Sequence, residues 1–295
     1  MDAILQSIIS GILVGGIYAL ISIGLTLIFG IVRIVNFAHG EFLMLGMYFT
    51  YFVFTYLGID PYLAILLVVP LMFFLGAITH KLVIKPVLRG TSMQHILVTV
   101  GLMFFFQNIA LLLWTADYRT VRTDLSSQVL RFGNINIGMP RLLAFLVAIA
   151  VTIGIYLFLK HTYLGKAIRA VSMDRQGAML MGINIDFIYT FAFALGIALV
   201  GLAAAMMSPI YYVFPTVGPM FEVVAFVVVV LGGLGNFTGA LLGGLLIGLV
   251  ESFSGFFIAP ALKEAIYFAI FIVVLAIKPS GLFGMGAGFE EVGLK

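Results

Sequence analysis

Long apolar runs separated by short polar connections are the feature that most restricts how this chain can fold. A hydrocarbon core of about 30 Å is crossed by about 20 helical residues, each rising 1.5 Å. Strands of a membrane barrel would instead alternate in runs of about 10 residues. The runs are found at about 4–31, 37–57, 61–80, 93–115, 141–159, 187–208, 221–234, 238–258 and 262–277. They predict an all-α, polytopic transmembrane helix bundle.

The composition supports a single transmembrane domain covering residues 1–295. Only 9% of the residues are charged and 63% are hydrophobic, whereas a soluble domain has about 25% charged residues. Lipid is therefore an expected partner, and nucleic acid is not. No basic region precedes the first run, so we expect no cleaved signal peptide. Glycines interrupt residues 221–258, which predicts broken helices and a count of eight or nine membrane segments.

Basic residues in the short connections predict the orientation, because cytoplasmic loops carry more Lys and Arg. With nine crossings, the cytoplasmic side has Arg33, Lys81, Lys85, Arg89, Lys160, Lys166, Arg169, Arg175 and Lys278. The other side has Arg119, Arg122, Arg131, Arg141 and Lys263, together with Asp2, Asp60, Asp117, Asp124 and Glu222. This predicts the N-terminus outside and the C-terminus inside; eight crossings would place the C-terminus outside.

Two connections are longer than a turn requires. Residues 116–140 form a polar periplasmic loop, which is either merely solvated or a docking surface for an external partner. Residues 160–185 are placed in the cytoplasm and have the pattern of one or two short helices lying outside the bilayer. In the second segment, small residues keep one surface close-packed while Lys166, Arg169 and Arg175 stay solvated. Gly182 is placed to end a helix in a left-handed cap.

Polar residues between the first two runs have two interpretations. Asn36, His39 and Gly40 would share one helical face, with Glu41 off it. The segment is either a cytoplasmic turn with hydrated side chains or a broken helix bordering a translocation path. One His and one Glu at this spacing make a poor metal-ligand set.

Glycines and one acidic residue mark the later runs. The pairs Gly11 and Gly15, Ala192 and Gly196, Gly239 and Gly243, and Gly244 and Gly248 have the spacing that lets helix backbones approach closely. Gly232 and Gly233 end a short apolar run, as expected for a half-helix or hairpin near the membrane centre, and are candidates for the pathway. Glu251 is either a pore-lining carboxylate or a buried partner of a Ser or a backbone group.

No constellation for catalysis, metal binding or cofactor binding is expected. The sequence lacks cysteine, and it lacks HExxH, GxSxG and the phosphate-binding GxxxxGK[ST] pattern. If transport is driven by ATP, hydrolysis must therefore occur on a separate polypeptide.

Four segments resemble the LivH-type permeases, which are membrane subunits of bacterial high-affinity branched-chain amino-acid ABC importers. They are GGIYALISIGLTLIFGIVRIVNFAHGEFLMLG (15–46), YLGKAIRAVSMDRQGAMLMGIN (163–184), VVVVLGGLGNFTGALLGG (227–244) and KPSGLFG (278–284). The resemblance covers nearly the whole chain in the same order. It favours the pathway interpretation of residues 36–41, because related sugar permeases have a broken helix there.

The resemblance implies several partners in the bacterial inner membrane and beside it. These are a second, LivM-like permease forming a heterodimer, two cytoplasmic ATP-binding subunits, and a periplasmic protein delivering leucine, isoleucine or valine. Residues 163–184 would be the coupling region, with Gly165, Lys166, Arg169, Ala170, Asp174 and Gly182 as candidate contacts with the ATPase. The family also includes permeases for urea, amides and other amino acids. A secondary transporter of small solutes and, more distantly, an intramembrane enzyme are the alternatives from other classes.

Overall fold

The computed structural model describes residues 2–284, and its architecture is a helix bundle. The nine predicted runs correspond to α1 (Asp2–Val32), α2 (His39–Leu57), α3 (Pro61–Thr79), α5 (Ser92–Trp114), α6 (Met139–His161), α9 (Ile185–Met207), α10 (Gly218–Gly232), α11 (Phe237–Phe257) and α12 (Lys263–Ile277). Shorter elements are a π-helical turn (His80–Ile84), α4 (Lys85–Val87), α7 (Tyr163–Met173), α8 (Arg175–Leu180) and 3-10 turns at Asp124–Ser127 and Pro260–Leu262. The predicted all-α class is confirmed.

Seven helical segments among the described residues are long and apolar enough to cross a membrane. α2 is not among them, and α10 is only 15 residues long. At 1.5 Å per residue, α10 reaches about 22 Å, less than the roughly 30 Å of a hydrocarbon core. α2 and α10 are therefore the elements that fit the predicted broken helices.

Local sequence signals explain where several helices begin. Asp60 accepts a hydrogen bond from the backbone N–H of Tyr62 at 3.0 Å, and Pro61 occupies the first turn of α3. Thr91 and Gln94 form a reciprocal capping box at the start of α5. These side chains pair the first backbone N–H groups, which have no partner within a helix.

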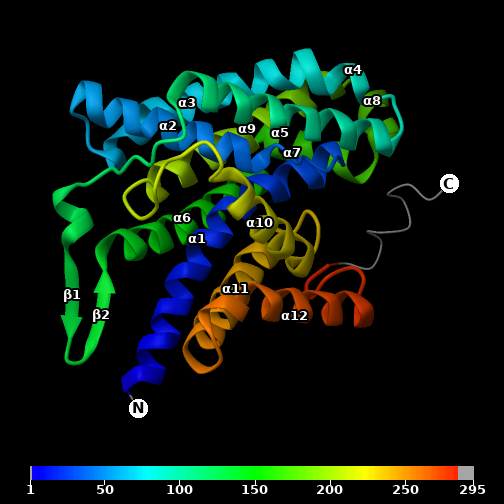
Figure 1. The fold of residues 1–295 in the computed structure, drawn as a ribbon. Coiled ribbons are helices and arrows are strands. Elements are labelled where there is room, and N and C mark those ends of the chain that lie inside the picture. The colour runs from blue at the N-terminus through cyan, green and yellow to red at the C-terminus, as the bar shows by residue number, and fades with distance from the viewer. Residues whose placement is uncertain (1, 285–295) are drawn as a thin grey trace.

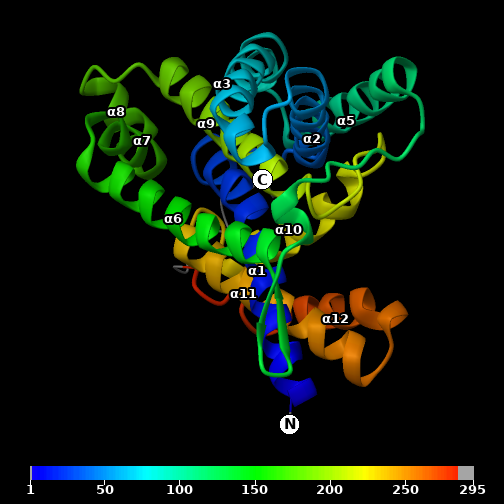
Figure 2. The ribbon, with the colours of Figure 1, turned by 90° about the vertical axis from the view of Figure 1, so that its left-hand side faces the viewer.

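The centre of the bundle is α1, which packs against α6, α9, α10 and α11. Figure 2 shows α1 passing between the group formed by α2, α3, α5 and α9 and the pair α11 and α12. The most apolar 18-residue stretch of α1 is 89% buried, compared with 6% for the stretch that includes α12. α1 is thus a protein-facing core helix, whereas α12 presents its side chains outward.

Glycines allow α1 and α11 to approach backbone to backbone. A Cβ atom added at Gly248 would stand 2.3 Å from the backbone nitrogen of Gly15, and one added at Gly244 would stand 2.7 Å from that of Ala19. Two of the predicted small-residue pairs therefore pack against each other, Gly11 and Gly15 against Gly244 and Gly248. Close packing of this kind holds membrane helices together, because lipid provides no hydrophobic driving force for their association.

The two ends of the bundle differ in charge. Arg33, α4, α7 and α8 lie at one end, here called the Arg33 end, and the N-terminus and a β-hairpin lie at the opposite end (Figure 1). The connections at the Arg33 end contain the basic residues that the sequence assigns to the cytoplasm. The predicted grouping of these connections on one side is therefore confirmed, while its assignment to the cytoplasm stays a prediction.

A short hairpin is present within the loop predicted at 116–140. Strands β1 (Val129–Phe132) and β2 (Ile135–Gly138) pair in antiparallel fashion, with Gly133 at φ 62° in the two-residue turn. Glycine adopts this left-handed conformation without steric cost, which favours a tight hairpin. Asn134 on the turn donates a hydrogen bond to Asp2 at 2.7 Å, so the loop is attached to the start of α1.

Candidate translocation and coupling sites

The helical backbone is interrupted between α1 and α2. Arg33 adopts φ 57°, residues 33–38 are not helical, and α2 begins at His39. Asn36 therefore does not share a helical face with His39 and Gly40, and that prediction is wrong. Its side-chain carbonyl instead accepts a hydrogen bond from the backbone N–H of Ala38 at 3.2 Å, a local turn contact that competes with helix formation.

α2 begins well inside the bundle rather than at its end. The Nε2 atom of His39 lies 3.1 Å from the backbone carbonyl oxygen of Ile21, in the middle of α1. Ile21 is about 16 Å along the axis from Val32, where α1 ends. The 33–38 segment therefore turns back into the bundle before α2 starts.

α10 begins at the same place. A Cβ atom added at Gly40 would stand 2.3 Å from the carbonyl oxygen of Gly218, the first residue of α10. The carboxylate of Glu222 accepts a hydrogen bond from the backbone N–H of Gly40. The prediction that Glu222 is a charge on the outer side is wrong. Glu222 is buried in the second turn of α10, where its carboxylate pairs with a backbone N–H group at the start of α2.

Four polar side chains are buried at this junction. Asn36 and His39 are 0% exposed, Glu41 is 1% exposed and Glu222 is 7% exposed. The interpretation of residues 36–41 as a hydrated turn is therefore wrong, and the broken-helix geometry is present. Within the described chain, Asn36 Nδ2, His39 Nδ1, both carboxylate oxygens of Glu41 and Glu222 Oε1 have no hydrogen-bonding partner. Buried polar groups left this way cost free energy, so the cluster is a strong candidate for a functional element.

The predicted segment at 160–185 forms α7 and α8. Thr162 accepts a hydrogen bond from Gly165 N at 2.9 Å, and Asp174 Oδ1 accepts from Gln176 N at 2.9 Å and Gly177 N at 3.0 Å. Gly182 at φ 78° ends α8 as predicted. The sequence predicted one or two short helices here, and the structure has two.

The six candidate coupling residues divide by exposure. Lys166, Arg169, Asp174 and Gly182 are exposed, and Ala170 is half-buried. Gly165 is buried, because a Cβ atom there would stand 2.2 Å from the carbonyl oxygen of Phe158 in α6. Gly165 therefore fixes how α7 packs on α6, and the exposed four remain available to a partner.

α7 contacts the broken-helix segment directly. The Nη2 atom of Arg33 donates a hydrogen bond to the carbonyl oxygen of Ser172 at 2.9 Å. Sequence reasoning missed this contact, since Arg33 was used only for orientation. It connects the last turn of α7 to the first residue of the segment that leads to Asn36 and Glu41.

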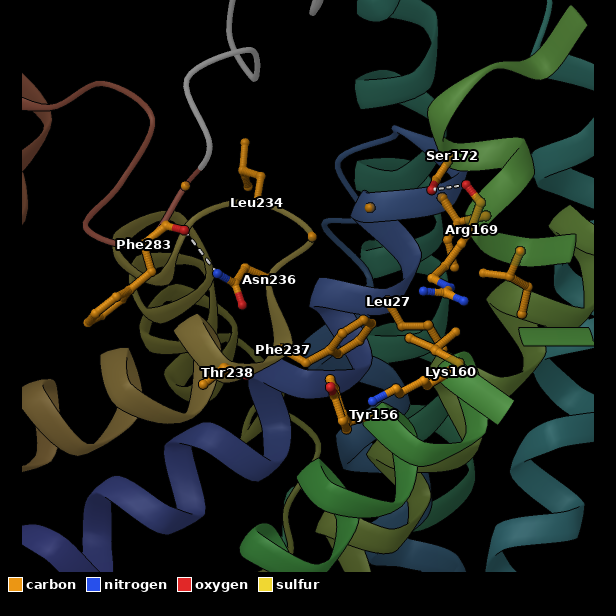
Figure 3. Close-up of a pocket in the computed structure, with 16 residues that line it drawn as sticks. Leu27, Tyr156, Lys160, Arg169, Ser172, Leu234, Asn236, Phe237, Thr238 and Phe283 are labelled. Atoms are coloured by element: carbon orange, nitrogen blue, oxygen red, sulfur yellow. Dashed lines mark hydrogen bonds between the residues drawn. The ribbon is translucent and has the colours of Figure 1, made fainter. Parts of the chain in front are cut away.

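A cavity of about 560 Å³ lies between α1, α6, α7 and the turn from α10 to α11. Figure 3 shows Arg169 and Lys160 extending into this cavity from α7 and α6, opposite Asn236 and Phe237. The structure thus brings Arg169 near the turn that follows Gly232 and Gly233. That turn was expected near the membrane centre, but a Cβ atom added at Gly30 would stand 2.8 Å from Gly235 Cα, which places the turn at the Arg33 end.

Glu251 lies apart from the other candidates, toward the opposite end of α1. Its carboxylate accepts a hydrogen bond from the hydroxyl of Tyr18 and forms an ion pair with Lys263 at 2.6 Å. Its partners are Tyr18 and Lys263 rather than the Ser or backbone group that was expected, and whether Glu251 lines the pathway stays a prediction. Across residues 2–284, no three His, Asp or Glu side chains come together as a potential metal-binding group.

The fold defines a polytopic helical membrane protein, and broken helices of this kind are typical of transporters. The profile of the branched-chain amino acid transport system permease component family matches residues 7–275, and the chain belongs to this family. It is a multi-pass protein of the inner membrane and a permease component of a transport system.

Three relatives illustrate the similarity. The high-affinity branched-chain amino acid transport system permease protein BraD of Pseudomonas aeruginosa is 32% identical, over 95% of each chain. The corresponding LivH protein of Escherichia coli is 30% identical, again over 95% of each chain. The probable LivH protein of Methanocaldococcus jannaschii is 28% identical over 93% of this chain and 90% of its own. No solved structure matches the chain.

Proposed function

We propose that this chain is the permease subunit of an ATP-driven ABC importer that carries leucine, isoleucine or valine across the inner membrane. Its membership of the permease family over residues 7–275 carries the proposal. The partners would be a second, LivM-like permease, two ATP-binding subunits at the Arg33 end, and a periplasmic binding protein that delivers the substrate.

The surface of α7 and α8 supports a partner at the Arg33 end. Met173, Leu180 and Met181 are 85%, 85% and 83% exposed. Methionine side chains are flexible and suit an adaptable protein interface, and exposed apolar residues gathered on one surface mark interaction sites. Lys166 and Arg169 extend from α7 at the same end and would add contacts with acidic groups of the ATPase.

The contact between Arg33 and Ser172 supports a route from the ATPase to the pathway. A displacement of α7 would move the 33–38 segment through this hydrogen bond. That segment sets the start of α2, where Gly40 meets Gly218 and Glu222 of α10. The junction of two half-helices is suited to switch between two packings, as alternating access requires.

The substrate assignment rests on the relatives, whose names specify branched-chain amino acids. Urea, short amides and other amino acids are the alternatives within the same type of importer. An ion-coupled transporter is the alternative from another class, and the buried carboxyl groups of Glu41 and Glu222 are the observation that favours it.

Uptake into proteoliposomes tests the proposal. The chain reconstituted with its second permease, ATPases and binding protein should take up labelled leucine only with ATP. An excess of unlabelled urea should not reduce this uptake. Uptake driven by an ion gradient in liposomes that contain this chain alone would establish the secondary transporter instead.

Substitutions at the coupling segment test the docking surface. Arg169→Glu and Gly182→Val should abolish uptake and weaken copurification of the ATPases while leaving membrane insertion intact. Gly101→Ala is a matched control in α5, because a Cβ atom there meets nothing within 4 Å. Full uptake and normal ATPase association in the Arg169 and Gly182 variants would disprove the coupling role.

A further inference from the structure

A groove of about 760 Å³ lies between α3 and α9. One wall follows α3 and the turns after it, and the other follows α9 in the opposite direction. Its lining includes Phe73, Ala77, Lys81, Lys85, Phe187 and Phe191. The groove has a cationic end and an aromatic end.

The aromatic end lies deep along the helices. The rings of Phe73 and Phe191 meet edge to face with centroids 5.7 Å apart, and those of Phe187 and Phe191 stack at 6.1 Å. Ala77 lies between these rings and the lysines, so no large side chain fills the groove there. From Lys85 to Phe73 the helix extends about 18 Å at 1.5 Å per residue, which is close to the thickness of one leaflet of a roughly 30 Å hydrocarbon core.

The cationic end lies at the Arg33 end. Lys85 pairs with Asp186 at 2.9 Å, and Arg89 and Arg175 also lie within electrostatic reach of that carboxylate. Among the residues that line the groove, Asp186 is the one carboxylate, whereas Lys81 and Lys85 are both cationic. The neighbourhood therefore has an excess of positive charge at the level where an apolar helix leaves the membrane.

A membrane lipid fits this groove better than a soluble anion does. Phe74, Ile78 and Leu82 on the neighbouring face of α3 are exposed apolar residues, so the groove opens among side chains that need lipid as their solvent. Basic pockets between membrane helices on the cytoplasmic side are known to bind anionic headgroups.

We propose that the groove between α3 and α9 binds an anionic phospholipid. The headgroup phosphate lies beside Lys81 and Lys85, and one acyl chain lies over Ala77 against Phe73, Phe187 and Phe191. Thr190 on α9 connects that wall of the groove to the π-helical turn after α3, because its hydroxyl lies 3.0 Å from Nδ1 of His80. The bound lipid would therefore support the contact between α3 and α9, independently of what the protein transports.

Native mass spectrometry of the purified full chain, titrated with phosphatidylglycerol or phosphatidylcholine, tests the proposal. Phosphatidylglycerol should bind more tightly, and Lys81→Gln should weaken it about fivefold, which is the contribution expected of one basic side chain near an anionic headgroup. This substitution leaves the ion pair between Lys85 and Asp186 intact. Lys166→Gln removes the same charge at the same end but outside the groove, and should leave the affinity unchanged.

Filling the groove gives a second, charge-independent test. Ala77→Trp should abolish the phosphatidylglycerol preference, with an unchanged circular dichroism spectrum showing that the helices remain folded. Equal binding of both lipids, or the same loss in Lys81→Gln and Lys166→Gln, would overturn the proposal. Release of the lipid when the other subunits assemble would also overturn it, because a protein would then cover the groove.

Discussion

The carboxylate of Glu222 accepts a hydrogen bond from the backbone N–H of Gly40, a residue 182 positions earlier in the chain. The bond joins the first turn of α2 to α10, which begins beside Gly40 at Gly218. Helix N-termini carry partial positive charge and unpaired N–H groups, so a carboxylate is the side chain that suits such a position. The junction therefore depends on Glu222 for its stability and its geometry.

Replacing Glu222 should reveal this dependence. Glu222→Ala leaves the buried N–H of Gly40 without an acceptor, which costs about 1–3 kcal/mol. Glu222→Gln retains an oxygen acceptor and should therefore lose less stability than Glu222→Ala. Thermal unfolding of the purified variants in detergent measures both, with Glu264→Ala, an exposed carboxylate on α12, as the control. Equal melting temperatures for Glu222→Ala and Glu264→Ala would show that the bond contributes nothing.

A second prediction concerns the closeness of the two half-helices. Gly40→Ala would place a methyl group 2.3 Å from the carbonyl oxygen of Gly218, so the helices must separate. Overpacking of this kind costs about 1–3 kcal/mol, and it should also reduce uptake. Gly154→Ala on α6 is the matched control, because a Cβ atom there meets nothing within 4 Å and alanine favours the helix. Uptake by the Gly40 variant at the level of the Gly154 variant would contradict the proposed role of the junction.

Much of the fold was predictable because membrane helices leave a strong local signal. Each of the nine apolar runs became a helix, and the small-residue spacing at Gly11 and Gly15 correctly indicated close backbone packing. The capping pattern around Gly182 likewise located the end of α8. These features depend on residues within a few positions of one another, where periodicity and caps can be read directly.

The candidate site was less predictable, because its contacts join distant segments. Nothing near Glu222 in the sequence indicates that its partner is Gly40, and its place at the start of an apolar run led to its assignment to the outer side instead. The same limit applies to the bond from Arg33 to Ser172 and to Lys263 as the partner of Glu251. Helical periodicity also extended a face through Asn36, although the backbone leaves the helix at Arg33.

A third prediction tests the pairing of Glu251. The ion pair with Lys263 is partly shielded, since the side chains are 14% and 40% exposed. Glu251→Gln should destabilise the protein. Lys263→Gln should cause little further destabilisation in the Glu251→Gln background, because contacting residues couple by about 0.5–3 kcal/mol. A double-mutant cycle on thermal unfolding measures the coupling. Additive effects would show that Glu251 and Lys263 stabilise the protein independently. Loss of uptake without loss of stability in Glu251→Gln would indicate that Glu251 lines the pathway.

The fourth prediction separates the rigidity of the coupling segment from its charge. Asp174 accepts hydrogen bonds from Gln176 N and Gly177 N at 2.9 and 3.0 Å, so Asp174→Ala removes the cap of α8 at a cost of about 0.5–2 kcal/mol. Asp174→Asn removes the charge but keeps an acceptor, which makes it the matched control. Hydrogen exchange should accelerate at residues 175–180 in the alanine variant alone, and ATP-dependent uptake should fall with it. If the asparagine variant loses uptake as well while exchange stays slow, the carboxylate contacts the ATPase directly, and the cap is not what conveys the coupling.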